Sequence, residues 1–296
     1  MELNTLLQYK PYSTARTEKR ALYAGLLTGL TQFHRERCPE YGRLLDALGC
    51  PAHMDCTVES TPMLPVSLFK ELELRSIPEG EVFKTITSSG TTGQRVSRIF
   101  LDGATSACQQ QALCQIMSDF LGERRLPFLV LDSRQVLRNR AMFSARGAGI
   151  LGFSIFGTRP CYALDEHMEL DLDGVRAFLE EHQGETIFLF GFTFIIWKHV
   201  VRALEERGER LDIPNGILVH GGGWKKLAGE AVSPGEFKAR VAAATGVERV
   251  SNYYGMAEQT GCIYMECPQG HLHASLWSDI VVRRGRDYRP CEPGEE

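Results

Sequence analysis

The sequence predicts an α/β fold, with layered, substantially parallel sheets and flanking helices. Two observations lead to this fold class. Short apolar runs alternate with helical patterns from residue 81 onward, as in parallel sheets whose strands are joined by helices. Three of these runs, at residues 127–132, 186–192 and 216–222, are almost continuously apolar, which is typical of buried strands. The ordinary composition, 43% hydrophobic and 24% charged, excludes a disordered or fibrous chain.

Residues 1–80 are predicted to form a helical lead-in that packs on the main domain. Apolar residues spaced by three and four positions predict a helix over residues 17–37. A second helix is expected over residues 40–48, because Gly49 follows as a stop signal. The next segment, "STPMLPVSLFK" (residues 60–70), contains two prolines and is therefore predicted to be an extended connection.

Residues 81–296 are predicted to form the α/β core. Its clearest helix, over residues 234–245, begins with the sequence Ser-Pro-Gly-Glu at residues 233–236, in which the serine hydroxyl is expected to accept a hydrogen bond from the amide of the glutamate. The predicted strands lie at residues 81–87, 95–102, 127–132, 186–192, 216–222, 249–254 and 279–284, and the predicted helices lie at residues 105–121, 173–183, 193–206 and 234–245.

Charge, hydropathy and cysteine content indicate which partners the protein is not expected to bind and in which compartment it is expected to be found. The net charge of −4 gives no basic surface, so a nucleic acid is not expected as a partner. The longest apolar stretch, residues 187–197, is shorter than the ~20 residues of a membrane span, so no membrane span is expected. Nine cysteines without a CxxC pair, and no secretory signal at the N-terminus, predict free thiols in the cytoplasm.

The loop "TSSGTTG" (residues 87–93) lies between two predicted strands. Gly90 and Gly93 allow successive backbone amides to converge on an anion, and the neighbouring hydroxyls add further donors. This composition suits a cradle for a polyphosphate, and it equally suits the tip of a hairpin. A Walker P-loop is excluded, because Gln94 and Arg95 lead into a strand where that motif has a lysine and a helix.

Two further loops follow predicted strands. In "HGGGWKK" (residues 220–226), consecutive glycines at the carboxyl end of a strand permit a flat ligand to approach the backbone, although they also suit a tight turn. In "NYYGMAEQTG" (residues 252–261), an aromatic ring can stack on a base and Glu258 can hold a divalent cation. The alternative for this loop is a core tyrosine beside a solvated glutamate.

A cluster of cysteines and histidines near the C-terminus is a candidate zinc site. Cys262, Cys267, His271 and His273 provide two thiols and two imidazoles, the ligands of tetrahedral zinc. Their spacing is irregular, and the odd separation of the cysteines would place them on opposite faces of a strand. A turn with an exposed pair of histidines is therefore the favoured interpretation.

Together the three loops resemble the adenylate-forming ligase superfamily, through "TSSGTTG", "GGGW" and "YYGMAEQ". The resemblance extends from about residue 30 to residue 296, and it is closest to the acyl-protein synthetase (LuxE-type) family of bacterial luminescence fatty-acid reductases. The segments that carry this closer resemblance are "CPEYGRLL", "LPVSLFK", "FSARGAGILGF", "LFGFTF", "VHGGGWKKL" and "YYGMAEQTG".

This resemblance implies the fold of the large N-terminal domain of adenylate-forming ligases and an acid–thiol ligase activity. A carboxylic acid, expected to be a fatty acid, attacks the α-phosphate of ATP in the presence of Mg²⁺, and the acyl group then passes to a protein thiol. An acyl-reductase is the implied partner protein. The nucleotide-binding residues implied by the motifs are Ser88, Ser89, Gly90, Thr91, Thr92, Gly93, Gly222, Gly223, Trp224, Tyr253, Tyr254, Gly255 and Met256.

The resemblance also implies catalytic and acyl-binding roles. Glu258 would hold Mg²⁺, and Arg95 would replace a lysine that many superfamily members have at the first motif. His220 would polarise the substrate carboxylate, or else serve as a buried structural histidine. The acyl chain is expected near Phe192, Thr193 and Phe194, which equally suit plain core.

Several parts of the family pattern are expected to lie beyond residue 296. These are the ribose-binding aspartate, the hinge, the small C-terminal domain and the acyl-carrying cysteine. We therefore expect the natural chain to continue, and none of the nine cysteines is assigned as the nucleophile.

Two alternatives to the acyl-protein synthetase remain open. One is an acyl- or aryl-CoA ligase related to phenylacetate–CoA ligases, which would release acyl-CoA. The other is a non-catalytic nucleotide-binding subunit of a reductase complex. A serine hydrolase is disfavoured, because the sequence contains no GxSxG motif.

Overall fold

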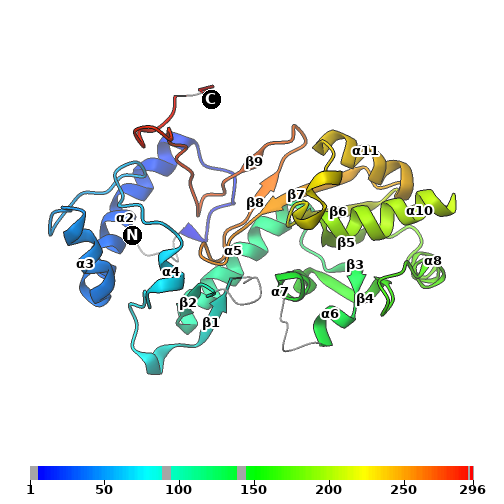
Figure 1. The fold of residues 1–296 in the computed structure, drawn as a ribbon, viewed down its shortest axis with the longest axis horizontal. Coiled ribbons are helices and arrows are strands. Elements are labelled where there is room, and N and C mark those ends of the chain that lie inside the picture. The colour runs from blue at the N-terminus through cyan, green and yellow to red at the C-terminus, as the bar shows by residue number, and fades with distance from the viewer. Residues whose placement is uncertain (1–5, 89–94, 139–144, 293, 296) are drawn as a thin grey trace. The chain divides into compact units, whose positions relative to one another are not determined.

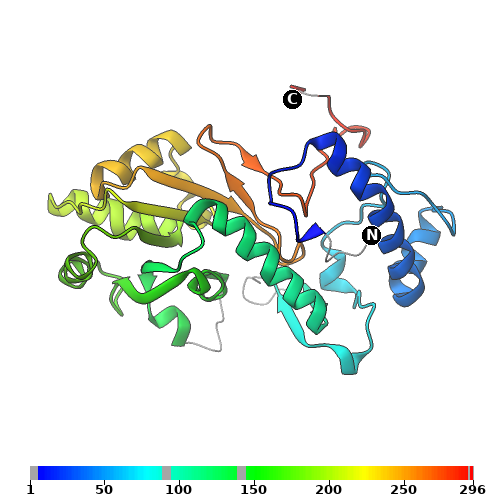
Figure 2. The ribbon, with the colours of Figure 1, turned by 180° about the vertical axis from the view of Figure 1, so that it is seen from behind.

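The computed structural model describes residues 6–88, 95–138, 145–292 and 294–295. Contacts within the chain define two compact units (Figures 1 and 2). Unit 1 consists of Met1–Ile116, Gly255–Ile263 and Ala274–Glu296, and unit 2 consists of Met117–Tyr254 and Tyr264–His273. Residues 81–116 thus group with the preceding helices.

Unit 2 contains the main sheet, whose strand order is β4-β3-β5-β6-β7-β8-β9. The pairs from β4 to β7 are all parallel, and the last two pairs are antiparallel. This arrangement confirms the predicted α/β fold with a substantially parallel sheet. The strands are β3 Leu126–Ser133, β4 Gly157–Leu164, β5 Ile187–Phe192, β6 Gly216–Gly221, β7 Arg249–Tyr254, β8 Tyr264–Glu266 and β9 Leu272–His273.

Helices cover both faces of this sheet (Figure 1). They are α6 Gln135–Arg138, α7 Ala145–Phe153, η3 Ser154–Phe156, α8 Leu172–Glu181, α9 Thr193–Ile195, η4 Ile196–Val201, α10 Arg202–Arg207, η5 Lys225–Glu230 and α11 Pro234–Thr245.

Side chains of β5 alternate between the two covered faces, as the pleat of a strand requires. On one face, the ring of Phe153 from α7 stacks on Phe190 at a centroid distance of 4.3 Å. On the other face, Gly191 leaves room for Ile196 of η4, because a Cβ atom at residue 191 would lie 3.0 Å from the Ile196 Cγ1 atom. Both faces of β5 are therefore filled with apolar groups, which explains its continuous apolar sequence.

The helix predicted after β5 is present, with a local change of type. It begins as α9, continues as the π-helix η4 and ends as α10 at Arg207. The predicted start of α11 is also correct, since the Ser233 hydroxyl accepts a hydrogen bond from the Glu236 amide at 3.2 Å. Strand β4 was not predicted; it contains Pro160 and lies at the edge of the sheet, where a proline is tolerated. The sequence also did not predict α6, α7, β8 and β9, and the segment predicted to be extended over residues 60–70 becomes helical in α4, from Leu68.

Unit 1 carries the N-terminal helices and a small antiparallel sheet of β1 and β2, in which Thr87 pairs with Arg98. The predicted first and second helices are present, and positive φ (+70°) at Gly49 accompanies the end of the second. The elements are α2 Arg16–Arg37, α3 Pro39–Ala47, α4 Leu68–Glu71, η1 Glu79–Glu81, β1 Lys84–Thr87, β2 Arg98–Leu101 and α5 Gly103–Leu121, the last of which ends in unit 2.

The strand predicted over residues 279–284 is wrong. All of these residues are described, and they form an irregular segment whose one bridge pairs Arg283 with Pro290. Ile280 and Val282 are 47% and 65% exposed. The apolar side chains that suggested a strand are therefore not covered by a second layer, so nothing in this region stabilises an additional strand.

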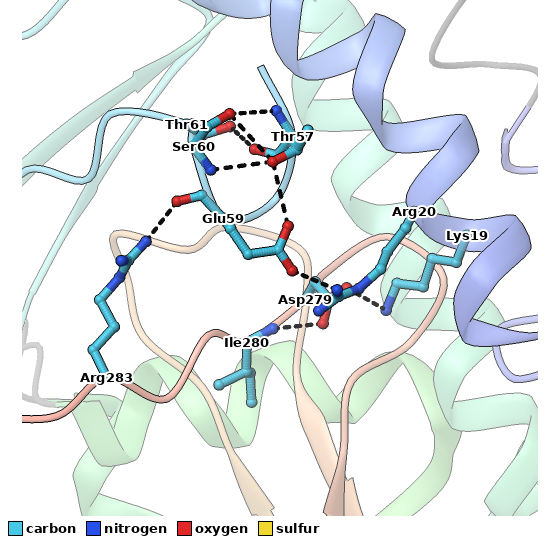
Figure 3. Close-up of polar contacts among 9 residues, drawn as sticks. All are labelled: Lys19, Arg20, Thr57, Glu59, Ser60, Thr61, Asp279, Ile280 and Arg283. Carbon is cyan, nitrogen blue, oxygen red and sulfur yellow. Dashed lines mark hydrogen bonds and ion pairs between the residues drawn. The ribbon is translucent and has the colours of Figure 1, made fainter. Parts of the chain in front are cut away.

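Polar contacts attach this C-terminal segment to helix α2 (Figure 3). Lys19 is 8% exposed, and its ammonium group donates to the carbonyls of Ser275, at 2.9 Å, and of Ser278. The same group lies 3.9 Å from a carboxylate oxygen of Asp279. Because the Lys19 ammonium is buried, these acceptors replace the water that it loses.

A second set of contacts lies beside the first. Arg20 of α2 forms an ion pair with Glu59, and the backbone carbonyl of Glu59 accepts a hydrogen bond from Arg283 at 2.7 Å (Figure 3). Helix α2, the turn around Glu59 and the segment around Arg283 are thereby linked within unit 1.

Candidate active site

The carboxyl ends of three parallel strands bring the predicted site residues of unit 2 together. Phe192 at the end of β5 pairs with Gly221 of β6, and Gly221 pairs with Tyr253 of β7. The residue predicted to contact the acid and a residue predicted to contact the nucleotide therefore flank the same glycine. The carboxyl edge of a parallel sheet is also where α/β proteins usually bind ligands.

Two glycines at this edge have positive φ, and at one of them a close contact also excludes a side chain. Gly222 has a φ of +79°, and a Cβ atom there would lie 2.5 Å from Cδ1 of Phe192. Gly223 has a φ of +61°, but a Cβ atom there would meet nothing within 4 Å. Gly222 and Gly223 are both exposed, so their backbone is open to a ligand. This geometry suits the close approach of a flat group to the loop.

Thr193 and His220 form a buried pair beneath the glycine loop. The Thr193 hydroxyl donates to the Gly221 carbonyl at 3.1 Å and lies 2.9 Å from Nδ1 of His220. Since this hydroxyl has one proton, the proton between it and His220 resides on Nδ1. Nε2 of His220 is then an acceptor, and it is buried without a partner among the described residues.

The His220 ring is 5% exposed, and its burial, with a smaller effect of the nearby Lys238 ammonium, lowers its pKa to about 3. The ring is therefore neutral at pH 7. It contributes hydrogen bonds and packing, with Phe237 at a centroid distance of 4.7 Å, and no positive charge.

Trp224 packs under the loop rather than projecting freely. Its ring meets Trp197 of η4 edge to face, with centroids 5.2 Å apart, and Trp197 is in turn covered by the guanidinium of Arg240 at 4.2 Å. The loop after β6 is thus anchored to the π-helix by aromatic contacts, which hold the preceding glycines in place.

The two tyrosines at the end of β7 differ in environment. The Tyr253 ring packs against Phe153 at 5.0 Å, and burial raises the pKa of its phenol to about 12. The Tyr254 ring is 50% exposed and contacts Tyr264 at 6.1 Å. Tyr254 is therefore the ring on which a base can stack, whereas Tyr253 supports the sheet.

Two cations near this edge were not selected from the sequence. Lys225 directly follows Trp224, and its ammonium lies 5.4 Å from the ring centroid of Phe194. Arg146 of α7 donates through Nε to the fully buried Asp132 carboxylate at the end of β3, at 2.9 Å, and through Nη2 to the other oxygen. The signal was present in the motifs "GGGWKK" and "FSARGAG", but the placement of each side chain depends on its backbone and neighbours.

The other predicted site residues belong to unit 1. The Ser88 hydroxyl accepts a hydrogen bond from the Ser97 amide at 3.0 Å, and Arg95 forms an exposed ion pair with Glu71 at 2.7 Å. Glu258 is half-buried. The predicted residues Ser89, Gly90, Thr91, Thr92 and Gly93 lie outside the described residues, and Gly255 and Met256 are exposed.

Residues 267–271, which include two of the candidate zinc ligands, form the turn that the sequence favoured. The Cys267 amide donates to the His271 carbonyl at 2.9 Å, and Gly270 donates back to Cys267 at 2.9 Å. His271 and His273 are exposed, and the described residues contain no group of three candidate metal ligands.

The cysteines are free thiols. Burial raises the pKa of Cys161 and of Cys262 to about 11, and that of Cys114 in the same direction. These three thiols are protonated at neutral pH and are weak nucleophiles. In the described part of the chain, no helix has both the length and the apolar character needed to cross a membrane.

Known proteins resemble this chain in sequence and in fold. The family model described as "Acyl-protein synthetase, LuxE" matches residues 2–296. The long-chain-fatty-acid–luciferin-component ligase of Vibrio harveyi is 22% identical over 233 residues, which are 77% of this chain and 59% of that protein. The chain therefore spans about three-fifths of the length of this relative.

Two crystal structures of a 2-hydroxyisobutyryl-CoA ligase, in complex with 2-HIB-AMP and with R3-HIB-AMP, have TM-scores of 0.60 and 0.62 to this chain at 16% identity. The matches cover 93% and 97% of this chain and 57% and 59% of the ligase. This likeness confirms the predicted α/β fold. Because the family model covers nearly the whole sequence, as its motifs predicted, the chain belongs to the acyl-protein synthetase, LuxE family.

Proposed function

We propose that the chain belongs to an ATP-dependent acid–thiol ligase and carries its nucleotide- and acid-binding residues. A carboxylate oxygen of the acid forms a bond to the α-phosphorus of ATP, the bond to the β-phosphate oxygen breaks, and pyrophosphate leaves. A thiolate then attacks the acyl carbon, and AMP leaves. Family membership supports this activity. The single structural observation that carries it is the row Phe192–Gly221–Tyr253, which places candidate acid and nucleotide contacts on adjacent strands.

The residues at the carboxyl edge fit an adenine nucleotide. The exposed backbone of Gly222 and Gly223 can lie against the base, and the half-exposed Tyr254 ring can stack on it. Trp224 holds the loop, and Tyr253 holds the strand end beneath it. For the phosphates we propose the segment of residues 88–93, with Arg95 as a supporting cation.

We propose Glu258 as the ligand for Mg²⁺. A single carboxylate is sufficient for this ion when phosphate oxygens and waters complete its shell. Bound Mg²⁺ would neutralise charge on the phosphates. The half-buried position of Glu258 fits a carboxylate that is still open to such a ligand.

For the acid, we propose that the rings of Phe192 and Phe194 contact its apolar chain. Phe192 is buried against the glycine loop, and Phe194 is half-buried. The Thr193 hydroxyl is already bonded to Gly221, so its proposed role is to position the loop together with His220. A fatty acid as substrate is supported by the name of the Vibrio harveyi relative, a long-chain-fatty-acid–luciferin-component ligase. A protein thiol, with a reductase as partner, is the proposed acceptor.

Exchange of labelled pyrophosphate into ATP tests this proposal. The full-length protein should show exchange that depends on a carboxylic acid, with the strongest response to apolar acids. Labelled acid should then remain bound to the protein through denaturation and be released by hydroxylamine. Release as acyl-CoA would instead identify a CoA ligase. ATP binding without exchange, for every acid tested, would identify a non-catalytic nucleotide-binding subunit and overturn the proposal.

A further inference from the structure

Lys225 places a positive charge at the border between the glycine loop and the aromatic residues of β5 and α9. Its ammonium lies 5.6 Å from the ring centroid of Phe192 and 5.4 Å from that of Phe194. The residue is exposed overall although its ammonium is partly desolvated, and among the described residues no carboxylate acts on that ammonium. The lysine therefore offers an uncompensated cation directly beside apolar surface.

The backbone at Lys225 is in an unfavourable conformation for a lysine. Its φ is +45°, in the left-handed region that glycine adopts readily and residues with a Cβ atom rarely adopt. The two preceding glycines have φ values of +79° and +61°. A third left-handed position in this loop would be formed most easily by glycine, so the backbone conformation does not explain why residue 225 is a lysine. The side chain supplies the reason.

Arg146 contributes a second positive charge to the surroundings of Lys225. Partial desolvation lowers the pKa of the Lys225 ammonium, and the Arg146 guanidinium acts in the same direction. The charge of Arg146 is itself balanced by Asp132, which accepts two hydrogen bonds from it. Arg146 is therefore already paired, whereas no carboxylate in the described part of the chain acts on Lys225, so a bound anion would be stabilised chiefly by the Lys225 ammonium.

We propose that Lys225 binds the carboxylate of the substrate, an acid whose apolar chain lies along Phe192 and Phe194. This inference rests on the proposed function and names the residue that recognises the acid group. The Lys225 ammonium would pair with the carboxylate of such an acid, and the neighbouring aromatic rings would contact its apolar chain. The other oxyanion of the reaction, the α-phosphate of ATP, is the competing ligand that the experiment must distinguish.

Steady-state pyrophosphate exchange with decanoate provides the test. Lys225→Met should raise the KM for decanoate by about tenfold or more, as expected for the loss of a charged hydrogen bond, and should leave the KM for ATP within about twofold. Lys225→Arg should retain most of the affinity. Lys198→Met removes an exposed lysine of η4 and should change neither constant. If the KM for ATP rises in Lys225→Met and that for decanoate does not, the carboxylate assignment is overturned.

Two further measurements separate charge from structure. Inhibition by 1-decanol, which has the same chain and no carboxylate, should be equal in the wild-type protein and in Lys225→Met. Lys225→Gly should relieve the backbone strain and raise the unfolding temperature, and it should still lose decanoate affinity. Equal decanoate affinity in wild type and Lys225→Gly would show that the lysine does not bind the acid.

A binding measurement tests the role of Lys225 even if the protein shows no pyrophosphate exchange. Equilibrium binding of decanoate to the wild-type protein and to Lys225→Met, measured by calorimetry in the absence of ATP, compares the two directly. Weaker binding to the variant supports the assignment even without exchange activity. Equal binding, or no binding to the wild-type protein, overturns it.

Discussion

The Nδ1 atom of His220 lies 2.9 Å from the hydroxyl of Thr193. The same hydroxyl donates a hydrogen bond to the backbone carbonyl of Gly221, which follows His220 in strand β6. The start of α9 is thus bonded to the end of β6. These two hydrogen bonds hold the start of the glycine loop against α9. The histidine takes part in its neutral form.

The first prediction concerns the pH dependence of stability. The pKa of His220 is about 3 in the folded protein and 6.5 in the unfolded chain, so only the unfolded chain takes up a proton between these values. The free energy of unfolding therefore has its full value, as far as His220 is concerned, above pH 6.5. It falls by about 1.4 kcal/mol per pH unit as the pH decreases from 6.5 toward 3. His220→Asn preserves a polar partner for Thr193 and removes the titration. Urea unfolding at pH 7, 5.5 and 4.5 should show a smaller loss for this variant, and parallel losses in the two proteins would contradict the assignment.

The second prediction compares two adjacent glycines. Gly222→Ala should destabilise the protein by about 2–4 kcal/mol, because the new methyl group meets Phe192 and the backbone has positive φ. Gly223→Ala is the matched control, since it has the same backbone penalty, of about 1 kcal/mol, with open space around the methyl group. Equal free energies of unfolding for the two variants would mean that Phe192 does not constrain the loop.

The third prediction concerns the exposed tyrosine. Tyr254→Ala should weaken ATP binding by about 1–3 kcal/mol, the range for stacking of a base on an aromatic ring, with little change in unfolding temperature. Tyr254→Phe should bind ATP as the wild type does, because the ring is retained. Calorimetric titration with ATP measures both. If Tyr254→Ala binds ATP normally, the base lies elsewhere.

The fourth prediction concerns the buried lysine of unit 1. Lys19→Met should cost about 2–4 kcal/mol of unfolding free energy, because Asp279 and two backbone carbonyls lose their partner. Adding Asp279→Asn to this variant should recover part of the loss, since it removes the unpaired charge. Arg16→Met, at an exposed position of the same helix, should have little effect. A double variant no more stable than Lys19→Met alone would argue against the ion pair.

The central strands of the sheet were predictable because each is buried on both faces, so that its sequence is continuously apolar. Strand β4 was not, since an edge strand requires fewer apolar residues and tolerates Pro160. The opposite error occurred at residues 279–284, where apolar residues in a favourable pattern remain exposed. Pattern alone does not reveal whether a second layer will cover a segment.

The sequence was sufficient to predict which loops form the candidate site, but not the environment of each side chain in them. Gly222, Tyr253 and Phe192 could be placed at strand ends, and parallel strands bring such ends to one edge. The different environments of Tyr253 and Tyr254 follow from the direction of each side chain at the end of β7, which the motif does not specify. The position of the Lys225 ammonium could not be predicted, because it depends on the positive φ of that residue. The neutral state of His220 could not be predicted either, because it depends on the burial of the ring.

The bonds from Lys19 to the carbonyls of Ser275 and Ser278 join residues 256 and 259 positions apart. On a ribosome that adds about 5–20 residues per second, helix α2 is made tens of seconds before these partners emerge. During that interval the lysine stays hydrated and its helix has no permanent neighbour in the late segment. Unit 1 can therefore be completed only after residues 275–278 have been synthesised. A nascent polypeptide stalled before Ser275 should remain open to proteases at α2, while the earlier strands β3, β5 and β6 are already protected.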